Sequence, residues 1–305
     1  MKIIDLQNLV FSHPVAEDVD QLSFSFINFK KATSEIFIFD SNGKKFFESQ
    51  NKKFYDLASV TKPLTIGLIQ FIDPKAIKSD LSLLLNHQSG IPAWGILSKH
   101  NWKEQIEAYP IKKSPTVYSD FGALRAQIEF EKTKGKNLYN MVQGIWSNEV
   151  LHWKNVDKEK CLETGDRQFK KIIGDVHDPN AWIIKEELAH AGLFGTIEGL
   201  TQTLLNIQDK FDLISYFLSC FETKKYDRFI NAWDTVTDKV NTLAGGKCSD
   251  KTVGHLGFTG TSFWIDCEKQ KGVVILSNAT KKGWYQKAAL NDIRRQVGNL
   301  YWTEK

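Results

Sequence analysis

The chain has few cysteines, and they show no pairing pattern. Four cysteines occur in 305 residues, without Cys-x-x-Cys spacing and without clustering beside histidines. Such usage is typical of free, mostly buried thiols in a reducing compartment, and it argues against a disulfide framework or a structural zinc site.

Long hydrophobic runs are also absent. The first 30 residues alternate polar and apolar side chains, and they lack the basic segment, apolar stretch and small-residue cleavage site of a signal peptide. No run is long enough to span a bilayer. Together with the cysteine usage, these absences predict a cytoplasmic protein that does not bind membranes.

Neither sign of charge dominates. Forty Lys and Arg residues against 36 Asp and Glu residues give a net charge of +4, without a basic stripe, so nucleic-acid binding has no support. The sequence also lacks a His-Glu-x-x-His pair, a phosphate-cradling glycine loop and a Gly-x-Ser-x-Gly elbow. We therefore expect neither a metal nor another cofactor.

The most informative segment is Ser59-Val60-Thr61-Lys62. A lysine three residues after a serine on a helix lies on the same face, within reach of the hydroxyl. If burial or neighbouring positive charge lowers the lysine pKa, its neutral amine can deprotonate the serine. The alternative is a helix-capping Ser59 and a solvated Lys62, which the spacing alone favours.

Two further copies of this spacing act as an internal comparison. Ser41 and Lys44 flank a hairpin turn, and Ser49 and Lys52 lie in a polar loop. Only Ser59 precedes an apolar helix pattern, with a proline tolerated in the first turn; the residues of that pattern are Leu64, Ile66, Leu68, Ile69 and Ile72.

The remaining pattern places strands near both ends of the chain. Residues 35–48 predict a hairpin, and residues 255–266 and 272–278 predict two strands; helices are expected at 81–85, 124–142, 193–217 and 284–302. This order predicts an α+β fold, an α/β sandwich, with one antiparallel sheet built from both chain ends and flanked by helices.

The same order suggests two lobes. Residues 1–75 and 181–305 would form the α/β sheet lobe, and residues 76–180 a mainly helical lobe. The groove between them is the natural place for the site of a single catalytic unit.

Other polar segments offer chemistry with a structural alternative. Tyr118 precedes a predicted helix, where it can transfer protons if cations lower its pKa, or can simply pack beside a cap at Ser119 or Asp120. Trp94 can line a pocket, although packing is commoner. The 175–180 segment and the 87–89 turn favour loop-shaping roles.

His255 lies near the start of a predicted C-terminal strand. A histidine there can bind an anionic group or steady a tyrosinate, and Gly257 permits close backbone approach by a substrate. Backbone N–H groups beside it can stabilise an oxyanion. An ordinary strand entered through a glycine-rich turn is the alternative.

Taken together, these segments resemble the serine β-lactamase and penicillin-binding-protein superfamily. The branch is that of class C β-lactamase-like serine hydrolases, which includes esterases, D-aminopeptidases and D,D-peptidases. The resemblance spans roughly residues 35–300 and is carried, in family order, by residues 56–62, 83–92, 118–122, 174–181, 190–194 and 255–261.

The resemblance implies a role for each motif residue. Ser59 would be the acyl-accepting nucleophile, Lys62 would assist its deprotonation, and Tyr118 would act as general base and then acid. His255 would take the place of the lysine in the family's Lys-Thr-Gly element. Backbone N–H groups of Ser59 and Phe258 would form the oxyanion hole. We also expect substrate contacts from Asp120, Gly257 and Trp94.

Three departures from the family pattern matter. Leu256 replaces the threonine of Lys-Thr-Gly, His255 replaces a permanent cation with a group that titrates near neutrality, and Asp120 stands where many relatives have asparagine. They argue against efficient β-lactam hydrolysis and fit the branch that carries His-x-Gly.

The sequence therefore predicts a serine hydrolase that cleaves a small ester, amide or peptide through an acyl-enzyme on Ser59. One alternative is a D-amino-acid peptidase or D,D-carboxypeptidase acting on muropeptide fragments. Another is a non-catalytic binding or sensor protein on the same fold. The proton shared by Lys62 and Tyr118 belongs to the coupled pair, and the sequence leaves the substrate and the oligomeric state open.

Overall fold

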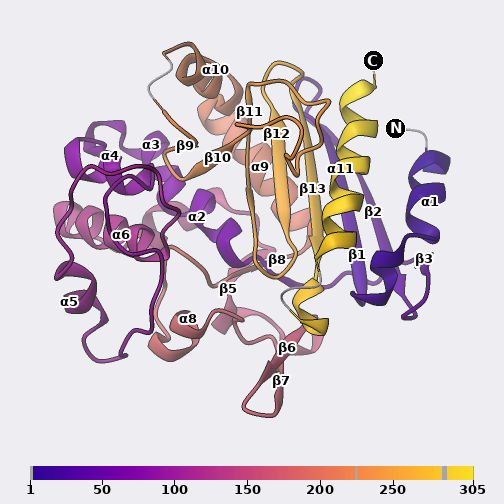
Figure 1. Ribbon diagram of the computed structural model, residues 1–305, viewed down its shortest axis with the longest axis horizontal. Helices are drawn as coiled ribbons and strands as arrows, with labels where there is room; N and C mark the ends of the chain where they lie inside the picture. The colour runs from indigo at the N-terminus through magenta and orange to yellow at the C-terminus, as the bar shows by residue number, and fades with distance from the viewer. Residues whose placement is uncertain (1–2, 224–225, 284–286, 305) are drawn as a thin grey trace.

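The centre of the molecule is one antiparallel sheet assembled from both ends of the chain (Figure 1). The structure is a computed structural model that describes residues 3–223, 226–283 and 287–304. Within these residues the sheet has eight strands in the order β3-β2-β1-β13-β12-β11-β10-β9. The predicted α+β sandwich is confirmed, and the two chain ends meet where β1 pairs with β13.

The bounds of the elements are as follows. The strands of the large sheet are β1 (Gln21–Asn28), β2 (Thr33–Ser41), β3 (Phe46–Glu48), β9 (Phe229–Ile230), β10 (Trp233–Thr235), β11 (Thr252–Leu256), β12 (Ser262–Asp266) and β13 (Lys271–Ser277). Two small sheets contain β4 (Tyr55–Asp56), β5 (Val150–His152), β6 (Glu163–Arg167), β7 (Lys170–Ile173) and β8 (Leu193–Gly195).

The α-helices are α1 (Ile3–Phe11), α2 (Thr61–Leu64), α3 (Ile69–Ile72), α4 (Ser79–Leu85), α5 (Trp102–Glu107), α6 (Asp120–Lys134), α7 (Leu138–Val142), α8 (Pro179–Ile184), α9 (Ile197–Phe211), α10 (Leu213–Thr223) and α11 (Ala288–Thr303). Short 3₁₀ turns include η2 (Ala58–Val60) and η3 (Ile66–Leu68), which flank α2.

Each face of the large sheet is covered by different helices. Successive side chains of a strand point to opposite faces. On β1, Phe24 and Phe26 pack in one hydrophobic cluster with α1 and α11, whereas Ile27 belongs to a second cluster that contains residues of α9. Figure 1 shows α1 and α11 together at one side of the sheet. The sheet is therefore the middle layer of a sandwich.

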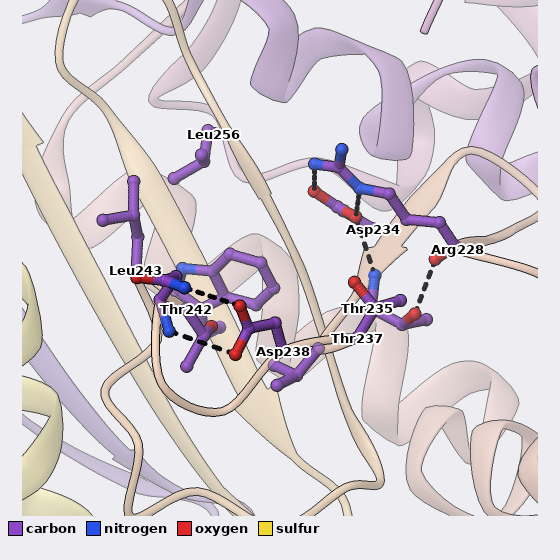
Figure 2. A pocket seen from close by; sticks show the side chains of 11 residues that line it. Arg228, Asp234, Thr235, Thr237, Asp238, Thr242, Leu243 and Leu256 are labelled. Atoms are coloured by element: carbon purple, nitrogen blue, oxygen red, sulfur yellow. Dashed lines mark hydrogen bonds and ion pairs between the residues drawn. The ribbon is translucent and has the colours of Figure 1, made fainter. Parts of the chain in front are cut away.

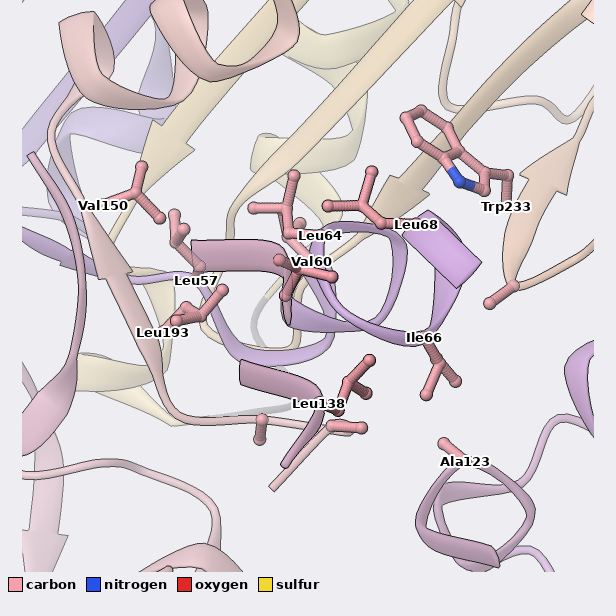
Figure 3. Close-up of a cluster of buried hydrophobic side chains, with 14 of the residues drawn as sticks. Leu57, Val60, Leu64, Ile66, Leu68, Ala123, Leu138, Val150, Leu193 and Trp233 are labelled. Carbon is pink, nitrogen blue, oxygen red and sulfur yellow. The ribbon is translucent and has the colours of Figure 1, made fainter. Parts of the chain in front are cut away.

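The segment after Ser59 is helical but interrupted. The prediction of one continuous helix is wrong, because Thr65, with φ −121° and ψ −92°, separates α2 from η3. Its hydroxyl donates to the carbonyls of Thr61, at 2.8 Å, and Ala189, at 2.9 Å. Because of the interruption, apolar side chains on several sides of the segment point into the core. Figure 3 labels Val60, Leu64, Ile66 and Leu68 of this segment, together with Leu57 just before Ser59.

Other sequence predictions are confirmed or corrected. The hairpin over residues 35–48 is present as β2 and β3. The single strand expected over residues 255–266 is two strands, β11 and β12, joined by a turn, so His255 lies near the end of a strand. Residues 193–195 form β8, and a helix begins only at Ile197. The helix predicted over residues 284–302 is present as α11, although residues 284–286 lie outside the described residues.

The segment between residues 76 and 180 contains the helices α4 to α7, and Figure 1 shows α4, α5 and α6 apart from the large sheet. The same segment also contains β5, β6 and β7, and β5 joins the small sheet that includes β4 and β8. The two-lobe boundaries at residues 75 and 180 stay a prediction. Each helix among the described residues is too short or too polar to cross a bilayer.

Candidate active site

Ser59 lies in a strained turn between a short strand and a helix. It is half-buried in η2, directly after Ala58, whose φ of 48° is unfavourable for a residue with a side chain. The Asp56 carboxylate holds this turn by accepting the Ala58 N–H at 2.8 Å. The Ser59 side chain caps neither η2 nor α2, so the capping alternative is wrong.

Lys62 is a buried cation and not a solvated charge. Its side chain is 0% exposed, and its Nζ lies 3.0 Å from Ser59 Oγ and 3.1 Å from the His190 carbonyl oxygen. The third neighbour is Asp120, whose carboxylate lies 2.7 Å from the same nitrogen. The spacing of Ser59 and Lys62 therefore places them in contact, as the sequence predicted.

Asp120 reverses the expected direction of the Lys62 pKa. Burial alone lowers this pKa, but the negative charge of Asp120 and the contact with Tyr118 outweigh burial and raise it above its ordinary value. The resting site thus holds an ammonium–carboxylate pair and not a neutral amine. Asp120 contacts Lys62, and its expected contact with substrate stays a prediction.

Tyr118 lies beside this pair as a neutral phenol. The Lys62 Nζ is 4.9 Å from the centre of its ring. Burial raises the pKa of Tyr118, and the opposing effect of Lys62 does not cancel it. The next residue caps α6 as expected, since Ser119 Oγ accepts the Gly122 N–H at 2.7 Å. The loop is shaped by His87, whose Nδ1 accepts the Ser119 N–H at 3.1 Å.

His255 is neutral and is fixed in one tautomer. A carbonyl can only accept a hydrogen bond, so the 2.8 Å contact of His255 Nδ1 with the Leu256 oxygen places the proton on Nδ1. Its Nε2 is a buried acceptor without a hydrogen-bond partner among the described residues. Burial, and then Lys62, lower the His255 pKa to about 3. The expectation of a group that titrates near neutrality is therefore wrong, and the binding of an anionic group by His255 stays a prediction.

The turn between β11 and β12 is pinned to the strand that precedes the serine. Thr259 Oγ1 donates to the Asp56 carbonyl at 2.6 Å, and Thr261 Oγ1 donates to the Leu57 carbonyl at 3.0 Å. These two hydroxyls bring Phe258 to the cavity that Ser59 also lines. The assignment of the Ser59 and Phe258 backbone N–H groups to an oxyanion hole stays a prediction.

Gly257 is required by this close approach. A Cβ at this position would lie 2.0 Å from Thr261 Oγ1 and 2.6 Å from the Leu57 carbonyl oxygen. We expect Gly257→Ala to lower the free energy of unfolding by about 1–3 kcal/mol, because the turn and the serine segment must move apart. Urea denaturation followed by circular dichroism measures this loss. Gly144→Ala is the matched control, since nothing lies within 4 Å of its Cβ; an equal loss in both variants would contradict the steric explanation.

A cavity of about 350 Å³ brings the predicted residues together. Ser59, Tyr118, His255, Gly257 and Phe258 line it. Trp94, with 49% of its surface exposed, is not among the lining residues, and its predicted substrate contact stays untested. The sequence did not predict seven of the lining residues: Arg228, Phe229, Asp234, Leu243, Lys287, Asn291 and Arg294.

Two of the missed residues are cations without an acidic partner. Within the described part of the chain, no carboxylate lies within ion-pair distance of Lys287 or Arg294; Arg294 instead donates to the Thr261 carbonyl at 3.0 Å and to Asn291 at 3.2 Å. Burial, and then Arg294, lower the Lys287 pKa to about 8. The only sequence signal was their position on one predicted helix, which does not reveal that the helix end faces the serine.

The polar segment at residues 175–180 holds neighbouring segments of the site in place through hydrogen bonds. This agrees with the loop-shaping role that the sequence favoured. The His177 N–H donates to Asp56 at 2.6 Å, and Asp178 caps α8 by accepting the Ala181 N–H. Asp178 also contacts His190 Nε2 at 2.9 Å; burial raises the Asp178 pKa, but His190 outweighs burial and the Asp178 pKa falls to about 2. The sequence suggested no role for His190. In the structure its ring contacts Asp178, and its carbonyl oxygen contacts Lys62.

The architecture and the place of the cavity define the class of fold, that of β-lactamases and D,D-transpeptidases. Comparison with protein-family models gives no match, and comparison with curated sequences gives none either.

Solved structures share the fold over nearly the whole chain. A D-amino acid amidase from Ochrobactrum anthropi, complexed with D-phenylalanine, is 15% identical, with a TM-score of 0.66 over 98% of this chain and 100% of that one. A β-lactamase/D-alanine carboxypeptidase from Pseudomonas syringae is 12% identical, with a TM-score of 0.63 over 95% and 96%. A hydrolase with promiscuous acyltransferase activity is 13% identical, with a TM-score of 0.61 over 92% and 95%. At these identities the likeness establishes the fold alone.

Proposed function

We propose that this protein is a serine hydrolase that cleaves an ester or amide through an acyl-enzyme on Ser59. The observation that carries the proposal is the contact of Ser59 Oγ with the buried Lys62 ammonium, which Asp120 neutralises, at the wall of a cavity. Proteins of the same fold support it, among them a D-alanine carboxypeptidase, a hydrolase with acyltransferase activity and a D-amino acid amidase. A serine whose proton can pass through an adjacent lysine to a paired carboxylate has the general base that covalent catalysis needs.

In the acylation step, Ser59 Oγ forms a bond to the substrate carbonyl carbon and loses its proton. Because Lys62 already carries a proton, it accepts this one only as it passes a proton to Asp120, 2.7 Å away. The pair is then formally an ammonium and a carboxylic acid. Backbone N–H groups of Ser59 and Phe258 stabilise the oxyanion.

Collapse of this intermediate breaks the bond to the leaving group, which takes up a proton through Tyr118. Water then attacks the acyl-enzyme carbonyl, gives up one proton to the same cluster, and releases the acid product while Ser59 Oγ regains its proton. The neutral His255 Nε2 accepts a hydrogen bond from the leaving group or from this water, since it is an unpartnered buried acceptor that lines the cavity.

A second candidate is a peptidase that cleaves next to a terminal carboxylate. Lys287 and Arg294 favour it, because two cations without acidic partners line the cavity of Ser59. We expect Arg294→Gln to raise KM for an ester that bears a carboxylate by about tenfold and to leave its neutral methyl ester analogue unchanged. Steady-state kinetics on the two compounds measures this difference, and equal changes in both would count against an anion-binding role.

The proposal is tested by intact-mass spectrometry after incubation with a fluorophosphonate and, separately, with a penicillin. A fluorophosphonate adduct that peptide mapping places on Ser59 is the expected result. A stable penicillin adduct in addition favours the D,D-peptidase alternative. If neither reagent modifies Ser59, the hydrolase proposal fails and a non-catalytic binding protein becomes the better interpretation.

We further propose a cytoplasmic location. All four cysteines are free thiols, and three of them are buried, as suits a reducing compartment. Cell fractionation with an antibody to the chain tests this; recovery from the oxidising exterior would contradict it.

A further inference from the structure

A second cavity adjoins the one that contains Ser59. Its volume is about 240 Å³, and β10, β11 and the loop after β10 form its walls (Figure 2). Four residues line both cavities: Arg228, Asp234, Leu243 and Leu256. The two cavities are therefore adjacent, with Leu256 among the residues that they share. We call the second cavity the outer compartment.

The charged groups of the outer compartment are already satisfied within the protein. Arg228 forms two hydrogen bonds to Asp234, both of 2.7 Å, as Figure 2 shows. Asp238 accepts from the Val240 N–H at 2.8 Å and from Asn241 Nδ2 at 2.7 Å. An ionic ligand would have to break one of these pairs, which disfavours it.

One donor in the compartment is not satisfied. Trp264 lines the outer compartment with 6% of its surface exposed, and its indole N–H is buried without an acceptor among the described residues. The indole lies across the neighbouring strand, where a Cβ on Gly254 would come within 2.6 Å of it. A buried N–H without a partner is costly and calls for an acceptor oxygen from a ligand or water.

We propose that the outer compartment binds the part of the substrate that lies beyond the reacting carbonyl, and that this part is an uncharged chain with alternating acceptors and donors, such as a peptide segment. Its carbonyl oxygen accepts from Trp264, and its N–H groups meet the side-chain oxygens of Thr237 and Asp238. This inference rests on the proposed hydrolysis at Ser59 and adds the class of substrate.

The test compares short and extended esters. The short probe is p-nitrophenyl acetate. One extended probe is the p-nitrophenyl ester of an acetylated tripeptide, which lengthens the acyl side. The other is an acetyl ester of a hydroxyacyl dipeptide amide, which lengthens the leaving-group side. The central variant is Thr237→Phe, because Thr237 is exposed and lines the outer compartment but not the cavity of Ser59. Val240→Phe is the matched control, since Val240 is on the same loop, 85% exposed, and lines neither cavity.

We expect Thr237→Phe to raise KM about tenfold for at least one extended ester, with turnover of the short ester and the rate of fluorophosphonate labelling unchanged. Trp264→Phe, which removes only the indole N–H and the second ring, should act in the same direction. Equal kinetics of wild type and Thr237→Phe on both extended esters, with Ser59 still labelled, overturns the outer compartment alone. Loss of Ser59 labelling in the wild type overturns the proposed hydrolysis, and this inference with it.

Discussion

Replacement of Ser59 by alanine is expected to lower kcat by about 10⁴-fold or more on any ester that the wild type hydrolyses, because the bond to the acyl group can no longer form. The loss should appear in kcat with little change in substrate binding, since Ser59 is one of many residues that line the cavity. Stopped-time assays of product, together with isothermal titration of a non-hydrolysable analogue, separate the two quantities.

The chain contains its own control for this variant. Ser49 has a lysine at the same spacing but bonds to Asp40 through its hydroxyl, at 2.6 Å, in a loop away from the cavity. Ser49→Ala should therefore keep full turnover. Residual turnover of Ser59→Ala near the wild-type rate would show that another group performs the chemistry.

Removal of the charge of Asp120 is expected to shift the pH dependence of the reaction. In Asp120→Asn the burial of Lys62 is no longer opposed by a carboxylate, so the Lys62 pKa falls. Because the variant has no carboxylate to take up the Ser59 proton, only a neutral Lys62 amine can act as the base, so kcat/KM should fall by about 10²-fold at neutral pH and should rise as the pH approaches the lowered Lys62 pKa. Initial rates between pH 5 and 10, compared with those of the wild type, measure this change.

Asp120→Glu is the matched control, because it keeps the negative charge and changes only the reach of the side chain. Its pH profile should keep the wild-type form, although its rate falls if the carboxylate no longer meets Lys62. An Asn variant with the wild-type rate and pH profile would show that Asp120 does not take up the Ser59 proton.

The sequence predicted those parts of the structure that depend on local pattern. The turn signal at Asn42-Gly43 predicted the β2–β3 hairpin, and the Ser119 cap was among the structural alternatives. The strand predicted over residues 272–278 is present as β13, which lies in the interior of the large sheet. These features depend on residues close in sequence, so a single chain suffices to find them.

The sequence failed where distant groups meet. The direction of the Lys62 pKa depends on the contact with Asp120 and on burial. The sequence reveals neither the contact nor the burial. The neutrality of His255 likewise depends on complete burial beside Lys62. Where the helix after Ser59 is interrupted, Thr65 donates a hydrogen bond to the Ala189 carbonyl, which lies far along the chain. Tertiary contacts overrode the local pattern at each of these positions.

The pairing of β1 with β13 governs when the site can exist during synthesis. Ser59 is translated before the turn that Thr259 and Thr261 bond to Asp56 and Leu57, more than 200 residues further along the chain. For much of its translation, a nascent chain therefore contains Ser59 without the β11–β12 turn that forms part of the same cavity. Such distant pairing also makes folding slow compared with a helical protein of equal length. The proposed activity would thus need this turn, and a fragment that lacks residues 259–261 would contain Ser59 without it.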